Sequence, residues 1–315
     1  MKRLLAALFG MALLVCGVSS APAAYPDRPV NYIIPFNPGG ESDIFARIQQ
    51  PHMEKALGQS ILIQYKPGGG GAIGWQELAR AKPDGYTTAG FNLPHIILQP
   101  MLRQNAGYKT EDLVPVMIFM TTPNLLTVKK SSPYKTLKEF LDAAKAKPGT
   151  ISIGGSGTQT AAHVGTLLLN KHAGVNFTYV PFSGQGDAMP AFLGDHVDSL
   201  MAQGPSVMPY LDQVRFLAVA TRERLPNLPD VPTFQELGFP NYEGSTRGLV
   251  VPPKTPRAVI DRLYQVCKDI NKNPEVAQTL AKNGFLLLDM NPDESVAFIK
   301  GLQKEYLGIL DELKK

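Results

Sequence analysis

The chain has 315 residues, of which 44% are hydrophobic and 18% charged. This is the composition of a globular protein rather than a disordered one, and the length suggests two domains. The formal net charge of +4 falls to +2 once Lys2 and Arg3 are removed with residues 1–23, which contain no acidic residue. A charge this close to balance gives no reason to expect a nucleic-acid partner.

Residues 1–23 have the pattern of a cleaved secretory signal peptide. Lys2 and Arg3 form a basic start, Leu4–Val18 an apolar centre, and Ala21–Ala23 a cleavage site of small residues. The apolar run is shorter than the roughly 20 residues that a spanning helix needs, which argues against the alternative of a membrane anchor. The sequence therefore predicts an exported protein.

The chain contains two cysteines, which bear on lipidation and on disulfide formation. Cys16 raises the alternative of a lipoprotein, but Val15 is bulkier than the small residue that normally precedes a lipidated cysteine. After cleavage Cys267 is the only cysteine left, so no internal disulfide can form and stability must come from the core.

In chain order, the first half repeats a unit of strand, glycine-rich turn and helix. Pro29–Pro35 is rich in β-forming residues and predicts a buried strand, and apolar residues at helical spacing then predict a helix up to Leu57. The turn between them, Pro35–Asp43, combines prolines with glycines that let backbone N–H groups approach a small ligand closely. The same pattern recurs in Ser60–Tyr65, Lys66–Gly71 and Ala72–Ala81.

The middle of the chain contains the first expected hinge. A short strand, Thr87–Phe91, leads into a loop that carries Asn92 and His95. Val114–Val128 then alternates apolar stretches with Thr121–Asn124, a composition that predicts a strand crossing between two domains.

The second half repeats the unit twice more. The first copy consists of the strand Thr150–Ile153, a Gly/Ser turn from Gly154, and a helix through Leu169; the second consists of Phe177–Phe182, Ser183–Asp187 and Ala188–Leu193. Further short strands are expected at Val197–Ala202 and Phe216–Ala220. The alternation of strands and helices predicts open α/β sheets, in which ligands bind outside the carboxyl ends of the strands.

The end of the chain predicts a return crossing and a helical region. Gly244–Gly248 precedes the apolar run Leu249–Val251, which favours a strand that returns to the first domain. From Pro256 onward the pattern is helical, with a last helix at Ser295–Leu313. Two sheets joined by two crossings face each other across a cleft.

Several kinds of chemistry find little support in the residues. Gly69–Gly74 spells the dinucleotide pattern, but no acidic residue follows about 20 positions later to hold a ribose. Ser156 lacks the glycine of a nucleophile elbow, since Thr158 stands there, so a hydroxyl donated to a ligand or a helix cap is favoured. The five histidines have no metal-ligand spacing and Cys267 stands alone, so we expect neither a metal nor a cofactor.

The remaining interpretation is recognition of an anion. Turns at the starts of helices offer N–H groups and hydroxyls that suit a small carboxylate. Arg247 is a candidate for a bidentate pair with a second carboxylate, with a surface or interdomain salt bridge as the alternative. For His95 and His163, ligand contact and a structural hydrogen bond both stay open.

A set of short motifs is spread over nearly the whole mature chain. They are Tyr25-Pro26, Pro29-Val30, Pro35-Phe36, Pro38–Gly40, Asp43, Ala46-Arg47, Leu57–Gln59, Pro67-Gly68, Gly70-Gly71, Gly74, Pro83–Thr87, Gly157–His163, Val180–Phe182, Gly184, Gly186, Leu228–Thr233 and Pro252–Pro256. Together they resemble the Bug (TctC-type) substrate-binding proteins of tripartite tricarboxylate transporters. Each motif is weak alone, whereas their combination is specific.

This resemblance implies a type II-like periplasmic binding protein: α/β, with two lobes, a two-crossing hinge and the ligand cleft between the lobes. We expect residues 1–23 as signal peptide, 24–122 with 248–315 as lobe 1, and 123–247 as lobe 2. The expected protein is a periplasmic monomer that captures a carboxylate and delivers it to the membrane permease subunits of such a transporter. The alternative is an exported hydrolase or lyase acting on a carboxylated molecule, with His163 or Asp187 as the base near Ser156.

The expected ligand-binding residues come from the turns of both lobes and from the crossings. They are Asn37, Pro38, Gly39, Gly40, Ser42, Gly69, Gly70, Ala72, Asn92, His95, Ser156, Thr158, Thr160, Gln185, Asp187, Gln203 and Arg247. Two departures from the family pattern bear on the ligand. Gln159 stands where the family often has glycine, and Arg247 stands where many members have an aromatic residue, which favours a di- or tricarboxylic acid.

Overall fold

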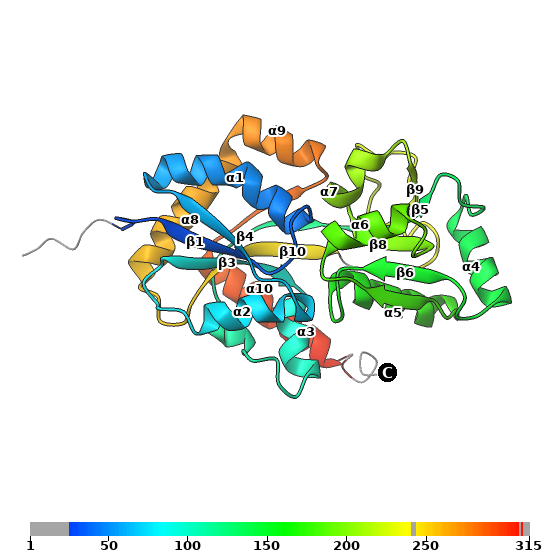
Figure 1. The fold of residues 1–315 in the computed structure, drawn as a ribbon, viewed down its shortest axis with the longest axis horizontal. Helices are drawn as coiled ribbons and strands as arrows, with labels where there is room; N and C mark the ends of the chain where they lie inside the picture. The colour runs from blue at the N-terminus through cyan, green and yellow to red at the C-terminus, as the bar shows by residue number, and fades with distance from the viewer. Residues whose placement is uncertain (1–24, 241–243, 309, 311–315) are drawn as a thin grey trace, which may run out of the picture.

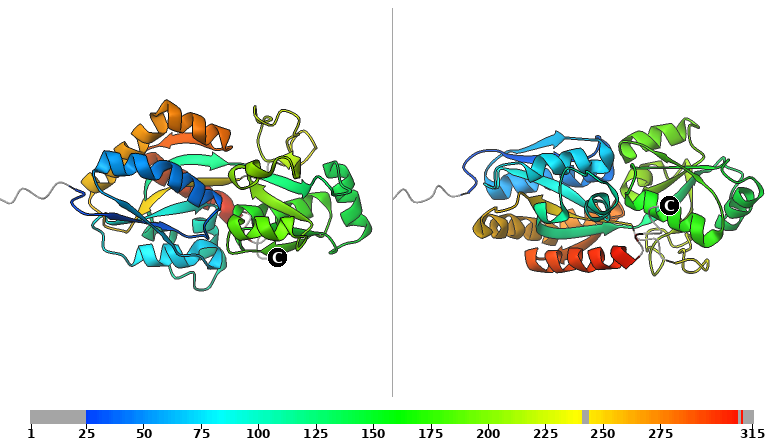
Figure 2. Two further views of the ribbon diagram at one scale, coloured as in Figure 1. Left: turned by 45° about the horizontal axis from the view of Figure 1, so that its top comes forward. Right: turned by 90° about the horizontal axis from the view of Figure 1, so that it is seen from below.

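The computed structural model describes residues 25–240, 244–308 and 310 of the chain. The predicted signal peptide lies outside the described residues. The described chain forms two α/β lobes that lie side by side, each built on one sheet (Figures 1 and 2). No helix in these described ranges has the length and apolar character needed to cross a membrane.

The first lobe contains a six-stranded sheet in the order β11-β4-β10-β3-β1-β2. Strands β1, β2 and β3 are parallel, whereas β4, β10 and β11 pair antiparallel with their neighbours. The strands are β1 (Val30–Ile34), β2 (Ile61–Tyr65), β3 (Thr87–Leu93), β4 (Val114–Thr122), β10 (Ser245–Val251) and β11 (Leu286–Met290).

Helices cover both faces of this sheet because each presents one apolar stripe to it. One core cluster contains residues of α1, α8 and α9, and another contains residues of α2, α3 and α10 (Figure 1). These helices are α1 (Glu41–Leu57), α2 (Ala72–Ala79), α3 (His95–Leu102), α8 (Arg257–Lys272), α9 (Pro274–Lys282) and α10 (Pro292–Gly308), with short 3₁₀ turns η1 (Gly69–Gly71) and η2 (Thr110–Asp112).

The second lobe contains a five-stranded sheet in the order β7-β6-β8-β5-β9, likewise covered on both faces. Its strands are β5 (Asn124–Lys129), β6 (Ser152–Gly155), β7 (Thr178–Pro181), β8 (Ser199–Gln203) and β9 (Val214–Val219). Its helices are α4 (Leu137–Ala146), α5 (Ala161–Ala173), α6 (Gln185–Leu193), the single turn α7 (Gly204–Val207) and the 3₁₀ turn η3 (Met208–Tyr210).

The chain passes from the first sheet to the second over a single residue, Pro123, which separates β4 from β5. The return path reaches the first sheet at Ser245, which pairs with Thr122 of β4. A Cβ at Gly244 would overlap the carbonyl oxygen of Thr122, so the two passages run in direct contact at this point. This geometry suits a narrow hinge.

The predicted two-lobed α/β fold is confirmed, with two local differences. β10 belongs wholly to the first sheet, so Ser245–Arg247 group with that sheet, whereas the expected lobe 2 extended to residue 247. The C-terminal third is not all helical, because Leu286–Met290 forms the edge strand β11 beside β4. The helical pattern on either side of this short segment masked it in the sequence.

Candidate functional site

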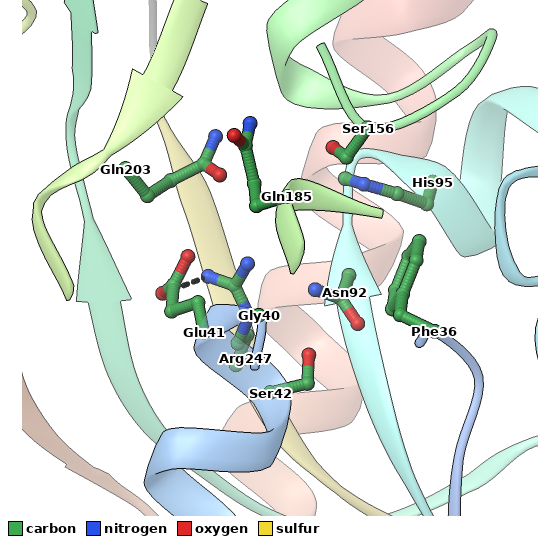
Figure 3. Close-up of a pocket in the computed structure, with 10 residues that line it drawn as sticks. All are labelled: Phe36, Gly40, Glu41, Ser42, Asn92, His95, Ser156, Gln185, Gln203 and Arg247. Atoms are coloured by element: carbon green, nitrogen blue, oxygen red, sulfur yellow. Dashed lines mark hydrogen bonds and ion pairs between the residues drawn. The ribbon is translucent and has the colours of Figure 1, made fainter. Parts of the chain in front are cut away.

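A small pocket lies between the lobes, where the carboxyl ends of β1, β3, β6 and β8 meet. About 280 Å³ of space free of protein atoms lies within it, and this figure includes open solvent. Side chains from both lobes surround it (Figure 3). The lining residues are Phe36, Gly40, Glu41, Ser42, Asn92, His95, Ser156, Gln185, Gln203 and Arg247.

The turn after β1 brings the start of α1 to the pocket. Gly39 has a φ of 79°, which a glycine adopts without strain, and its N–H donates to Oδ2 of Asp43 at 2.9 Å. The helix begins with Gly40 as N-cap and no side-chain cap. Ser42 is the second residue of α1 and so lies past the N-cap position, and it lines the pocket instead of capping the helix.

A buried ion pair forms one wall of the pocket. Nη1 of Arg247 on β10 contacts Oε1 of Glu41, the first residue of α1, and donates to Oγ1 of Thr122 at 2.8 Å. The Thr122 hydroxyl also bonds the Glu41 carboxylate. The hydrogen bonds orient the side-chain amide of Asn92 so that its oxygen accepts from Nε of Arg247 at 2.8 Å and from Nη2 at 3.1 Å. The guanidinium is therefore held entirely by lobe 1.

These contacts change the interpretation of Arg247. The sequence favoured a pair between Arg247 and a second carboxylate of the ligand, with a salt bridge as the alternative. In the structure the guanidinium is 7% exposed and pairs with a carboxylate of the chain itself. The argument from Arg247 for a di- or tricarboxylic ligand therefore loses its basis.

Burial sets the charge of the pocket. It raises the pKa of Glu41 to about 6, while Arg247 and the Thr122 hydroxyl oppose this rise. It also lowers the pKa of Arg247, while the adjacent Glu41 opposes this shift, and a guanidinium stays protonated in proteins. Burial and the charge of Arg247 hold the pKa of His95 well below its usual value. At neutral pH the ionised side chains of the pocket therefore sum to no net charge.

Acidification is expected to stabilise the fold, because the buried carboxylate of Glu41 destabilises it while ionised. The pKa of about 6 in the folded chain exceeds the ordinary 4.5, so between these values the folded chain holds a proton that the unfolded chain has lost. The ionised carboxylate lowers the unfolding free energy by its full amount above about pH 6. This loss disappears as the pH falls toward the ordinary pKa of glutamate, which is a change of about 2 kcal/mol.

Urea unfolding of the wild type and of Glu41→Gln at neutral pH and near pH 5 measures this effect. The wild type should gain stability relative to the variant on acidification. A relative loss would contradict the raised pKa.

Polar contacts join the lobes around the pocket. Nδ2 of Asn37 donates to Asp187 on α6. Arg103, after α3, donates to Oε1 of Gln159 and, through Nη2, to Oγ1 of Thr158 at 3.2 Å. Gln159 has a φ of 57°, which is rare for a residue other than glycine, and its N–H donates to Nδ1 of His163 at 3.1 Å. These contacts describe a closed arrangement of the lobes.

An Arg103→Ala variant is expected to bind ligand about tenfold more weakly, because charge-assisted bonds across the lobes are present only when the lobes close. Its melting temperature without ligand should change little. Arg28→Ala is the matched control, since Arg28 is an exposed arginine that pairs with Asp84 inside lobe 1. Calorimetric titration measures both variants, and equal losses in both would contradict a closing role for Arg103.

The expected site residues divide into two groups. Those that line the pocket are Gly40, Ser42, Asn92, His95, Ser156, Gln185, Gln203 and Arg247. Those that lie outside its lining are Asn37, Pro38, Gly39, Gly69, Gly70, Ala72, Thr158, Thr160 and Asp187.

Several residues of the second group instead hold the lobes together or build the local turns. Asn37 and Asp187 bond each other, Thr158 and the carbonyl of Gly69 accept from Arg103, and Thr160 caps α5 by accepting from the N–H of His163. His95, which was expected on a loop, is the first residue of α3, because Pro94 occupies the N-cap position.

Sequence reasoning missed two lining residues, Phe36 and Glu41. Phe36 is 6% exposed, and its ring meets those of Trp75 and His95 edge-on. Glu41 stands between two glycines and Ser42, in a turn whose predicted role was to bind the ligand through backbone N–H groups. An acidic residue in the first helical turn was the available signal, but its partner lies 206 residues away on β10.

The residues around Ser156 do not form a catalytic unit. Nδ1 of His163 already accepts from the N–H of Gln159, and burial lowers the pKa of His163 to about 4. Asp187 is bound to Asn37. Among the described residues no group of three or more His, Cys, Asp or Glu side chains is placed to hold a metal ion.

Comparison with known proteins identifies the family. The family model described as "Tripartite tricarboxylate transporter family receptor" matches residues 45–314. The chain belongs to this receptor family. Protein BugT of Bordetella pertussis is 29% identical, over 99% of this chain and 98% of BugT. The receptor family consists of substrate-binding proteins, so the chain is a binding protein and not an enzyme.

Two solved structures are similar to this chain over most of its length. An R. palustris protein solved with adipate has a TM-score of 0.87 and 26% identity, over 92% of this chain and 98% of that protein. MatC from Rhodopseudomonas palustris with bound malate has a TM-score of 0.83 and 30% identity, over 92% of this chain and 100% of MatC. The resemblance seen in the sequence motifs is thereby confirmed.

Proposed function

We propose that this tricarboxylate-family receptor acts in the periplasm, where it captures a small carboxylate between its lobes and delivers it to the membrane permease of a tripartite tricarboxylate transporter. The observation that carries the proposal is the polar interlobe pocket at the carboxyl ends of strands from both sheets. The two similar structures hold adipate and malate, which are carboxylates.

The pocket offers the groups that a carboxylate needs. The hydroxyls of Ser42 and Ser156 line it from opposite lobes. The start of α1 adds N–H groups that lack acceptors within the helix. Because donors come from both lobes, a bound carboxylate favours the closed arrangement over the open one.

Thermal unfolding of the mature protein with a panel of carboxylates tests the capture step. A ligand at about 100 times its dissociation constant should add about 2.7 kcal/mol of stability without being consumed. If no carboxylate raises the melting temperature, the capture proposal is wrong.

Delivery needs its own measurement. We expect that deleting either the receptor or the permease genes abolishes uptake of the bound carboxylate into cells. Continued uptake without the permease would separate the receptor from that partner. We further propose that the receptor works as a monomer. Light scattering during size-exclusion chromatography should give the mass of one mature chain.

A further inference from the structure

Two side chains that line the pocket carry hydrogen-bond acceptors that lack donors. Oε2 of Glu41 and Oε1 of Gln185 are buried and have no hydrogen-bond partner in the described part of the chain. Glu41 is 2% and Gln185 4% exposed. Nε2 of Gln185 donates to the carbonyl of Met201 at 3.2 Å, which fixes the amide and leaves its oxygen free. Buried acceptors without donors are costly, and both residues line the same pocket.

The direction of the Glu41 carboxylate supports this description. One oxygen is held by Arg247 and Thr122. Figure 3 shows the other oxygen at the edge of the carboxylate that faces Gln203 of the second lobe, whereas the Gln185 amide is directed away from Glu41. The unpartnered oxygen of Glu41 therefore faces the second lobe.

The pocket also offers donors. The hydroxyls of Ser42 and Ser156 line it. Because the oxygen of Asn92 accepts from Arg247, its NH₂ group is directed away from the guanidinium. A pocket that contains a free carboxylate oxygen as well as hydroxyl and amide donors is not matched by a symmetric diacid, which has no donor for that oxygen at neutral pH.

The charges of the pocket also favour a ligand with a single carboxylate. Arg247 is paired with Glu41 and is held by three further oxygens, from Thr122, Asn92 and the Ser245 backbone. A second carboxylate of the ligand would therefore lie beside the Glu41 carboxylate without a free cation. Two carboxylates in one buried site repel each other unless a proton or a cation is shared.

We propose that the free oxygen of Glu41 accepts a hydrogen bond from the ligand, so that the ligand is a small monocarboxylate with an amino, amide or hydroxyl group at its other end. This inference rests on the proposed function and narrows its substrate class. Glu41 binds the N–H or O–H group, while the donors of Ser42, Asn92 and Ser156 bind the carboxylate.

The test uses wild-type mature protein and ligands matched in length, at neutral pH. Each set, from succinate to adipate, contains the diacid, its monoamide, the ω-hydroxy acid and the ω-amino acid. At least one donor-bearing monocarboxylate should bind about ten- to hundredfold more tightly than the diacid of the same length, as measured by calorimetry. The three donor groups distinguish an ammonium, an amide and a hydroxyl as the natural partner of Glu41.

A Glu41→Gln variant adds a readout that a purely structural role would not move. It removes the carboxylate and frees Arg247, so the ratio of diacid to donor-bearing affinity should rise about tenfold or more. Glu305→Gln on the exposed side of α10 is the matched control and should keep the wild-type ratio. Thermal unfolding without ligand shows whether each variant is folded. If Glu41→Gln is not folded, the ligand panel on the wild type alone decides the test.

The outcomes separate this inference from the proposed function. Tighter binding of diacids by the wild type would overturn the inference and leave the capture of a carboxylate intact. Binding of donor-bearing acids with a ratio unchanged in folded Glu41→Gln would also overturn it. A failure of every acid to bind would overturn both the proposed function and the inference.

Discussion

A Gly186→Ala variant is expected to lose about ten- to hundredfold in ligand affinity while its unliganded fold stays intact. Gly186 is the second residue of α6 in lobe 2. In the closed arrangement a Cβ there would overlap the carbonyl oxygen of Pro38 and lie 3.3 Å from the amide nitrogen of Gly40, both in lobe 1. Because backbone atoms cannot rotate away, the lobes must separate instead.

The same substitution costs nothing inside lobe 2. Gly186 is helical and is absent from the glycines with positive φ, so alanine fits its backbone and favours the helix by up to about 1 kcal/mol. The unliganded melting temperature should therefore stay unchanged or rise. This combination of a stable fold with weak binding distinguishes blocked closure from misfolding.

Calorimetry and small-angle scattering measure the two consequences. In the wild type, ligand should reduce the radius of gyration by closing the hinge at Pro123, whereas in Gly186→Ala the radius should stay at its unliganded value. Gly301→Ala on α10 is the control, because a Cβ there meets nothing within 4 Å. Wild-type affinity in Gly186→Ala would mean that ligand binding does not need this arrangement of the lobes.

The sequence was most informative where local chemistry decides the structure. Glycine and proline confine the turn after β1 to a few backbone shapes, and the alternation of apolar strands and amphipathic helices predicts the two sheets. These features place Gly40 and Ser42 at the carboxyl end of a strand in the first sheet and Ser156 at the carboxyl end of a strand in the second, where ligands bind in open α/β sheets. They are properties of neighbouring residues.

The features that escaped sequence reasoning depend on distant partners. Whether Arg247 faces a ligand or Glu41 is decided by the antiparallel register of β10 against β3, which sets Arg247 opposite Asn92. Nothing in either local sequence encodes that register. Gln159 is similar, since the reason for a side chain at a left-handed position is its bond to Arg103 across the lobes.

An Arg247→Met variant is expected to lose about 3–5 kcal/mol of unfolding free energy at neutral pH, because it leaves the buried carboxylate of Glu41 without its cation. The double variant Glu41→Gln/Arg247→Met should recover most of this loss. The glutamine amide is neutral and still bonds the Thr122 hydroxyl, whereas the single variant buries an uncompensated charge. Urea unfolding of the wild type, both single variants and the double variant gives the coupling free energy.

The pH dependence identifies the cause of the loss. Without Arg247 the pKa of Glu41 must rise further above its ordinary 4.5, since the attraction that lowers it is gone. A carboxyl group with a raised pKa destabilises the fold above that pKa and ceases to do so as the pH falls toward the ordinary value. The other ionisable groups facing this pair, His95 and Tyr32, stay neutral in this range because burial lowers the pKa of the first and raises that of the second.

The deficit of Arg247→Met should therefore shrink between neutral pH and about pH 5, whereas that of the double variant should not. A deficit that is equal at both pH values, or that persists in the double variant, would mean that Arg247 stabilises lobe 1 by packing and not by neutralising Glu41. In that case the carboxylate would not need its cation to remain buried in the pocket wall.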